Sequence, residues 1–130
     1  MILVDTSVLV RYLRSGDATI RAVFAANVTA VSVVTRAEIL HGARDEADYR
    51  RLTTALDAFV QVGVDSATWE ALGRNLFLLR LQGTPIPFPD ALIATVAISE
   101  GLELWTFDNH FKLMKPALPA LQLFAPLGFP

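Results

Sequence analysis

The chain has 130 residues, of which 53% are hydrophobic and 18% are charged, and its formal net charge at pH 7 is −2. This length allows one domain with a substantial core. The small net charge excludes a general attraction to nucleic acid, so an RNA or DNA partner would require a local basic rim or bound metal. The chain contains no cysteine, which excludes disulfides, thiolate nucleophiles and zinc–thiolate sites and fits a reducing, cytoplasmic location.

The apolar content also bears on partners and membranes. The mean hydropathy of +0.44 is high for a small soluble protein and predicts that a partner or a second copy covers some apolar surface. Asp5 interrupts the first apolar run and no basic segment precedes it, so this start is not typical of a signal peptide. Charges interrupt each apolar stretch before the ~20 residues that a membrane span needs. We therefore expect no membrane segment.

The first predicted elements are a strand and two helices. Residues 2–4 are consecutive aliphatic residues, a pattern typical of a central parallel strand buried on both faces. A short helix over residues 8–14 follows and is expected to end at Gly16, because glycine readily adopts the left-handed conformation of a helix C-cap. Asp17 is then expected to cap a second helix that reaches residue 26.

The next predicted segment is a strand followed by two more helices. Residues 28–34 are rich in β-branched side chains, which favours a second strand. Thr35 and Glu38 have the spacing of a capping box. This spacing predicts a helix over residues 36–44, and a further amphipathic helix is expected over residues 47–59.

Another strand and a long helix are predicted in the middle of the chain. The strand covers residues 60–64, and Asp65 is expected to start a helix that ends near Gly83. Residues 84–89 contain three prolines and predict a stiff loop. The last of these prolines fits the first position of a new helix over residues 90–100.

The end of the chain completes an alternating pattern. Gly101 is expected to stop the preceding helix, and a strand over residues 102–107, a helical turn over residues 109–114 and an edge strand over residues 121–124 follow. No repeat, low-complexity segment or linker is present. Strands that alternate with helices along the whole length predict one three-layer α/β/α domain, residues 1–130, with a mainly parallel central sheet.

Four of the 13 acidic residues differ from the rest because apolar runs flank them, namely Asp5, Glu38, Asp90 and Asp108. Asp5 and Asp108 follow strands, whereas Glu38 and Asp90 fall in the first turn of a predicted helix. Strand ends and the helix starts that follow them share one edge of a parallel sheet. We therefore expect these four carboxylates to converge on one cleft. The other acids are expected to cap helices (Asp17, Asp65), to lie at a helix end (Glu100) or to be solvated (Asp45, Glu46, Asp48, Asp57, Glu70, Glu103).

Each of the four acids also has a local explanation. Capping of the next helix would be enough to explain Asp5, and a capping-box pairing with Thr35 would be enough to explain Glu38. Likewise, a favourable interaction with a helix dipole would explain Asp90, and an Asx turn would explain Asp108. If these local explanations were the whole account, the arrival of all four acids at the same sheet edge would be a coincidence. The shared cleft is therefore the favoured interpretation.

Converged carboxylates repel one another, and a divalent cation relieves that repulsion. Mg²⁺ and Mn²⁺ prefer oxygen ligands and therefore suit such a cleft. The spacing of His41 and His110 contains no zinc motif of the H-E-x-x-H type. Both histidines are expected to lie on the surface or beside metal ligands rather than to bind the metal.

Four segments carry these acids, with the sequences ILVDTSVL (2–9), SVVTRAEILHGA (32–43), PDALIATVA (89–97) and LWTFDNHF (104–111). Each segment is short, but their order, spacing and total length resemble PIN-domain nucleases. More narrowly, the chain resembles VapC-type toxins of type II toxin–antitoxin modules. The resemblance covers nearly the whole chain.

The resemblance implies a metal-dependent endoribonuclease that hydrolyses RNA phosphodiester bonds. Asp5, Glu38, Asp90 and Asp108 match the acidic positions of the family. Of these, Asp5, Asp90 and Asp108 are the first-choice ligands of Mg²⁺, for which Mn²⁺ is expected to substitute. Glu38 would ligate a second ion or help to deprotonate the attacking water. The number of metal ions is left open.

The resemblance also assigns supporting residues and shows two departures. Thr6 or Ser7 matches the hydroxyl position that steadies the first acid, and Thr106 is placed to orient Asp108. Phe88 stands where many relatives carry an acid or a small polar residue, and His110 stands where another acid is common. Metal affinity is therefore open as well.

The implied partners are an RNA substrate, a VapB-type antitoxin and a second copy in a homodimer, with DNA contacted only through the antitoxin. The antitoxin's C-terminal segment would lie along an apolar groove. The tail, residues 116–130, is either an interface that contains Leu118, Leu121, Phe124, Leu127 and Phe129 or a strand that completes the core. Five basic residues are candidates to position RNA, with solvated surface charge as the alternative explanation of each. They are Arg11, Arg14, Arg44, Lys112 and Lys115.

Two other classes of protein are disfavoured. A phosphatase with Asp5 as its nucleophile commonly needs a second acid two residues later, where this chain has Ser7. A receiver-like domain without catalysis needs paired N-terminal acids and a late lysine after a strand, and neither is present. The sequence does not identify the RNA, so tRNA, rRNA and mRNA remain open.

Overall fold

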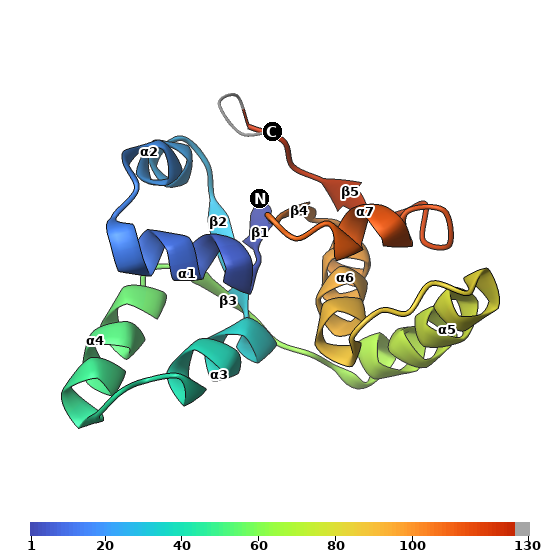
Figure 1. The fold of residues 1–130 in the computed structure, drawn as a ribbon, viewed down its shortest axis with the longest axis horizontal. Coiled ribbons are helices and arrows are strands. Elements are labelled where there is room, and N and C mark those ends of the chain that lie inside the picture. The colour runs from blue at the N-terminus through green and yellow to red at the C-terminus, as the bar shows by residue number, and fades with distance from the viewer. Residues whose placement is uncertain (127–130) are drawn as a thin grey trace.

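The computed structural model describes residues 1–126, in which a parallel sheet separates two groups of helices (Figure 1). The strands are β1 (Ile2–Val4), β2 (Thr29–Ser32), β3 (Val60–Val62), β4 (Glu103–Trp105) and β5 (Gln122–Leu123). Their order is β3-β2-β1-β4-β5, and each neighbouring pair is parallel. The first strand is therefore central, as its aliphatic sequence predicts.

The two layers of helices cover opposite faces of the sheet, and β1 contributes to both. Leu3 packs in a core cluster with α5 (Ser66–Gln82), α6 (Phe88–Glu100) and α7 (His110–Met114). Ile2 and Val4 point to the other face, in a cluster with α1 (Thr6–Ser15), α2 (Ala18–Ala26) and α4 (Glu46–Leu56). Because successive side chains of a strand alternate between faces, three residues anchor both layers. The predicted three-layer α/β/α architecture is confirmed.

Several predicted helix ends are confirmed. Gly16 ends α1 in the left-handed region at φ 60°, and Asp17 caps α2 by accepting hydrogen bonds from the backbone of Thr19 and Ile20. Gly101 ends α6 at φ 65°, a conformation that glycine adopts without a steric penalty. The chain then turns directly from α6 into β4.

The predicted capping box at Thr35 is wrong. Strand β2 ends at Ser32, and α3 (Val33–His41) begins at once because the Ser32 hydroxyl caps it by accepting a hydrogen bond from the Val34 backbone N–H at 3.1 Å. Thr35 is buried inside the helix. Glu38 therefore lies in the second turn of α3, not the first, and is not the partner of a cap.

The described part of the tail completes the core. Leu118 and Leu121 are buried, and β5 pairs with β4. The predicted tail residues Leu127 and Phe129 lie outside the described residues. Within residues 1–126, no helix is long and apolar enough to cross a membrane.

Candidate functional site

The fold brings the four predicted acids to one edge of the sheet. Asp5 follows β1 and Asp108 follows β4, while Asp90 lies in the first turn of α6 and Glu38 on α3. The charges of Asp5 and Asp108 both act on Asp90, and those of Asp5 and Asp90 act on Glu38. Residues that are far apart in the sequence therefore share one electrostatic environment.

Asp5 is both a helix cap and a member of this cluster. Its side chain is buried, and its Oδ2 accepts hydrogen bonds from the Ser7 hydroxyl at 2.7 Å and the Thr106 hydroxyl at 2.8 Å, with a longer one from the Ser7 backbone N–H that caps α1. The other oxygen, Oδ1, accepts no hydrogen bond from residues 1–126. The two explanations of Asp5 are thus compatible, because one oxygen caps the helix and the other is available to a ligand.

The predicted supporting hydroxyls lie next to the acids, with different partners. Ser7 and Thr106 contact Asp5, whereas the Thr6 hydroxyl donates to Glu38 Oε1 at 3.3 Å. Thr106 Oγ1 also accepts the backbone N–H of Asp108 at 3.0 Å. One hydroxyl therefore joins the ends of β1 and β4.

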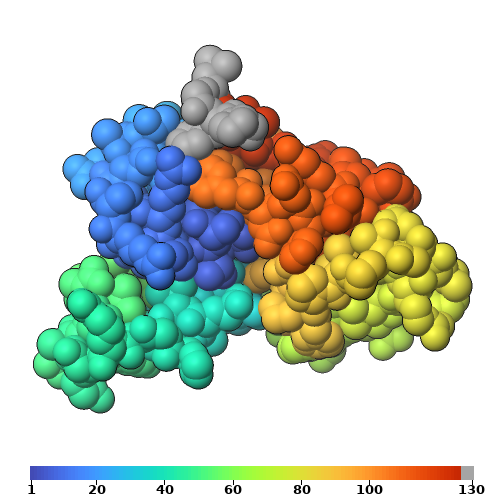
Figure 2. Space-filling view, viewed as in Figure 1, coloured from blue at the N-terminus to red at the C-terminus, as the bar shows by residue number. Residues whose placement is uncertain are grey.

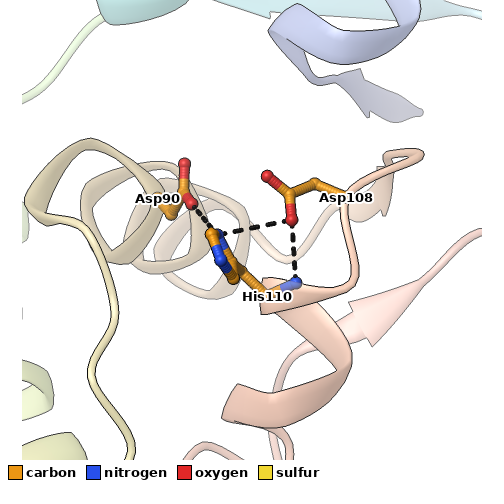
Figure 3. Close-up of side chains that lie close together, drawn as sticks. All are labelled: Asp90, Asp108 and His110. Atoms are coloured by element: carbon orange, nitrogen blue, oxygen red, sulfur yellow. Dashed lines mark hydrogen bonds and ion pairs between the residues drawn. The ribbon is translucent and has the colours of Figure 1, made fainter.

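His110 joins two of the acids, as Figure 3 shows. Its Nδ1 lies 2.8 Å from Asp90 Oδ2 and 3.3 Å from Asp108 Oδ1. Its backbone N–H donates to Asp108 Oδ1 at 2.9 Å, which forms the Asx turn that the sequence offered as a local explanation of Asp108. The sequence placed His110 on the surface or beside a ligand, and no feature of its spacing indicated this double contact.

The site concentrates negative charge in a partly desolvated environment. Desolvation raises the pKa of Asp90, the hydrogen bond from His110 opposes that shift, and the charges of Asp108 and Asp5 add to it. Desolvation likewise raises the pKa of Glu38, against the hydrogen bond from Thr6. The hydrogen bond to Asp90 raises the pKa of His110. The clustered carboxylates thus favour any cation that binds among them.

The donor atoms suit a divalent metal ion. One ligand atom from each of Asp90, Asp108 and His110 lies within 4.8 Å of the other two. Carboxylates are common ligands of Mg²⁺ and Mn²⁺, and imidazole is a common ligand of first-row transition-metal ions. Asp5 lies outside this group of three, although its charge acts on Asp90. The residues present therefore fit a divalent metal ion.

Two clefts adjoin the acids. A cleft of about 580 Å³ lies between α1, α3 and α4, and its lining includes Thr6, Arg14, Glu38, Arg44 and Arg51. A second cleft of about 510 Å³ has a lining that includes Arg11, Thr106, Asp108, Lys112 and Phe124. Each cleft thus contains at least one of the four acids together with basic side chains.

Asp48 organises the basic side of the first cleft, and the expectation that it is solvated is wrong. It is only 8% exposed and accepts hydrogen bonds from the Arg44 backbone N–H at 3.0 Å and from Arg51 Nη2 at 2.8 Å. These bonds lower the pKa of Asp48 to about 2. The neighbouring charges in the sequence suggested solvent exposure, whereas the fold turns Asp48 inward between two arginines.

The five basic candidates differ in their surroundings. Arg11 forms an ion pair with Asp17 at 3.4 Å and lies over the Phe107 ring. Lys115 donates a hydrogen bond to the Leu121 carbonyl, in the segment just before β5, and it lines neither of the two clefts. Arg14 and Arg44 line the first cleft, and Lys112 lines the second together with Arg11.

Comparisons with known proteins agree with this fold. The chain matches the PIN domain family over residues 2–115. The ribonuclease VapC4 of Mycobacterium tuberculosis is 34% identical over 97 residues, which cover 70% of this chain and 75% of VapC4. The ribonuclease VapC51 of the same organism is 31% identical over 114 residues, or 86% of this chain and 83% of VapC51.

Solved structures show the same architecture. VapBC2 from Rickettsia felis, bound to a DNA fragment from its promoter, has a TM-score of 0.85 at 23% identity and covers 95% of this chain and 98% of its own. Mycobacterium tuberculosis VapC20, described as a sarcin–ricin loop cleaving toxin, has a TM-score of 0.66 at 21% identity, with 87% and 94% covered. The chain belongs to the PIN-domain family. Within that family it is similar to the VapC ribonucleases, which confirms the resemblance seen in the sequence.

Proposed function

We propose that the chain is a divalent-metal-dependent endoribonuclease toxin of the VapC type, which hydrolyses RNA phosphodiester bonds. The observation that carries the proposal is the convergence of Asp5, Glu38, Asp90 and Asp108 at one sheet edge. In this proposal Asp5, Asp90 and Asp108 would hold Mg²⁺, and Mn²⁺ would be able to replace it. The names of the similar VapC4 and VapC51 support RNA as the substrate.

The metal and the side chains have separate tasks in this proposal. When bound, a divalent ion neutralises the scissile phosphate and makes an attacking water more acidic. Ser7 and Thr106 fix the orientation of Asp5 through hydrogen bonds to one oxygen, which leaves the other for the ligand role. Thr6 holds Glu38, whose raised pKa suits it to accept a proton from the water.

The basic clefts position the RNA on either side of the acids. Arg14, Arg44 and Arg51 lie in the cleft that contains Glu38, and Arg11 and Lys112 lie in the cleft that contains Asp108. Contacts between these cations and phosphates would overcome the repulsion between RNA and a chain whose net charge is −2. Figure 2 shows the α1, α3 and α4 side of the molecule separated from the α5 and α6 side by a recess in the lower part of the view.

The proposal includes a protein partner. The similar structures from Rickettsia felis and Salmonella typhimurium are VapBC complexes bound to DNA, which supports a VapB-type antitoxin as the partner here. DNA is then contacted through the antitoxin. We further propose a homodimer and a cytoplasmic location, where cellular RNA is the substrate.

The decisive experiment incubates the purified chain with total cellular RNA in Mg²⁺ and maps the new 5′ ends. Cleavage at defined positions is expected, EDTA should stop it, and added Mn²⁺ should restore it. The cut positions would identify the RNA. Cleavage that continues unchanged in excess chelator would instead indicate a metal-independent ribonuclease, and a complete absence of cleavage would remove the support for a nuclease.

A further inference from the structure

His110 places a ring nitrogen between two carboxylates at the start of α7. Its Nδ1 is 2.8 Å from Asp90 Oδ2 and 3.3 Å from Asp108 Oδ1 (Figure 3). Asp90 comes from α6 and Asp108 from the loop after β4. Three donor atoms from three segments therefore face one another.

The two nitrogen–oxygen distances match adjacent positions in the ligand sphere of a six-coordinate ion. Bond lengths of about 2.1 Å place adjacent ligands roughly 3 Å apart and opposite ligands roughly 4 Å apart. The two nitrogen–oxygen distances agree with adjacent positions, and the two oxygens lie within 4.8 Å of each other. A metal that binds these carboxylates would therefore have the imidazole nitrogen within reach.

The fold fixes the backbone position of His110. The backbone N–H of His110 donates to Asp108 Oδ1 at 2.9 Å, and the Asp108 N–H donates to Thr106 Oγ1 at 3.0 Å. The next residue, Phe111, is fully buried and anchors α7 in the core. The backbone that carries the imidazole is thus held beside the carboxylates by main-chain hydrogen bonds and by the packing of Phe111.

We infer that His110 is a metal ligand through Nδ1, which makes this a mixed nitrogen–oxygen site that prefers Mn²⁺ and later first-row divalent ions to Mg²⁺. Imidazole is a softer donor than carboxylate, and affinity for such sites rises along the series that begins with Mn²⁺. Mg²⁺ favours oxygen ligands. The inference rests on the proposed function, because it concerns the metal of the same site.

The test uses the full-length protein without a histidine tag and needs no RNA. The chain has two histidines, and His41 is exposed at the end of α3, so a His41→Ala variant is a matched control. We expect pulsed electron paramagnetic resonance of bound Mn²⁺ to show imidazole ¹⁴N coupling in the wild type and in His41→Ala, and to lose it in His110→Ala. In calorimetric titrations, the ratio of Mn²⁺ affinity to Mg²⁺ affinity should be lower in His110→Asp than in the wild type, by about tenfold or more.

The outcomes separate this inference from the nuclease activity. Loss of the nitrogen coupling in folded His110→Ala supports ligation, and a wild-type spectrum without nitrogen coupling overturns it. An unchanged affinity ratio in folded His110→Asp also overturns it. If these results were negative but metal-dependent RNA cleavage were observed, the proposed function would stand without the histidine ligand. If nitrogen coupling were observed without RNA cleavage, the metal site would stand and the proposed nuclease activity would be refuted.

Discussion

The Thr106 hydroxyl donates a hydrogen bond to Asp5 Oδ2 at 2.8 Å, although the two residues are 101 positions apart in the sequence. The same hydroxyl accepts the Asp108 backbone N–H. Thr106 therefore orients one acid directly and another through its main chain. This arrangement is possible because β1 and β4 are neighbours in the sheet.

Replacement of Thr106 separates its hydrogen-bonding role from its packing. Thr106→Val keeps the shape but removes the hydroxyl that bonds to Asp5 and to the Asp108 N–H and that lies 3.3 Å from Ser7 Oγ. We therefore expect metal-dependent RNA cleavage to fall roughly 10- to 100-fold. Loss of the bonds should cost about 1 kcal/mol in the free energy of unfolding. Thr106→Ser retains the hydroxyl and should keep most of the activity. Denaturant titration and cleavage rates of both variants check this, and equal activity of the two would contradict it.

The acids themselves can be neutralised with little change in shape. Asp5→Asn and Asp90→Asn each remove a negative charge from the proposed ligand set, so cleavage should fall by roughly 100-fold or more. The Asn side chain can still cap α1, so Asp5→Asn should remain folded by circular dichroism. Glu70→Gln, an exposed change on α5, serves as the control. Full activity of either purified aspartate variant would refute the mechanism.

The first basic cleft should affect RNA binding more than chemistry. Arg14→Ala and Arg51→Ala each remove a cation that lines it, so KM should rise with little change in kcat. The slope of log affinity against log salt should fall by about one for each phosphate that the variant no longer neutralises. Arg50→Ala changes the neighbouring residue on α4, which is exposed and does not line the cleft. An equal effect of Arg50→Ala would indicate general charge rather than a defined path.

The environment of Asp48 leads us to expect that the stability of the fold depends on pH in a specific way. The pKa of Asp48 is lowered from 3.8 to about 2 by hydrogen bonds from Arg44 and Arg51. A lowered pKa in the folded state stabilises the protein above the unfolded pKa near 4, and this contribution is lost as the pH falls toward 2. Asp48→Asn should therefore melt below the wild type at pH 7, with the difference shrinking as the pH falls through about 2 and vanishing below it. Glu46→Gln, an exposed change on the same helix, should show no such convergence in thermal melts.

The sequence predicted the sheet and the acids for local reasons. Three aliphatic residues followed by Asp5 indicated a buried strand with an acid at its end, and Asp108 had a similar setting. Glycines and capping aspartates marked several helix ends. These signals depend on neighbours in the sequence, so they need no knowledge of the fold.

The errors arose where tertiary packing overrides local preference. Val33 and Val34 favour a strand by propensity, yet the Ser32 cap starts a helix there. Asp48 is surrounded by charges in the sequence but is turned inward between arginines. The role of His110 depends on α7 being brought against α6, which no local spacing encodes.

The pairing of β4 with β1 also determines when the site can assemble during synthesis of the chain. The central strand leaves the ribosome first, but its neighbour on the Asp108 side comes roughly a hundred residues later. We therefore expect a nascent chain that ends before β4 to hold three of the four acids without the strand that orients Asp5. A released chain that ends at residue 100 lacks β4 and also Asp108 and His110. It should therefore bind Mn²⁺ more weakly than the completed chain in calorimetric titration, and equal binding would show that neither residue is needed for the metal site.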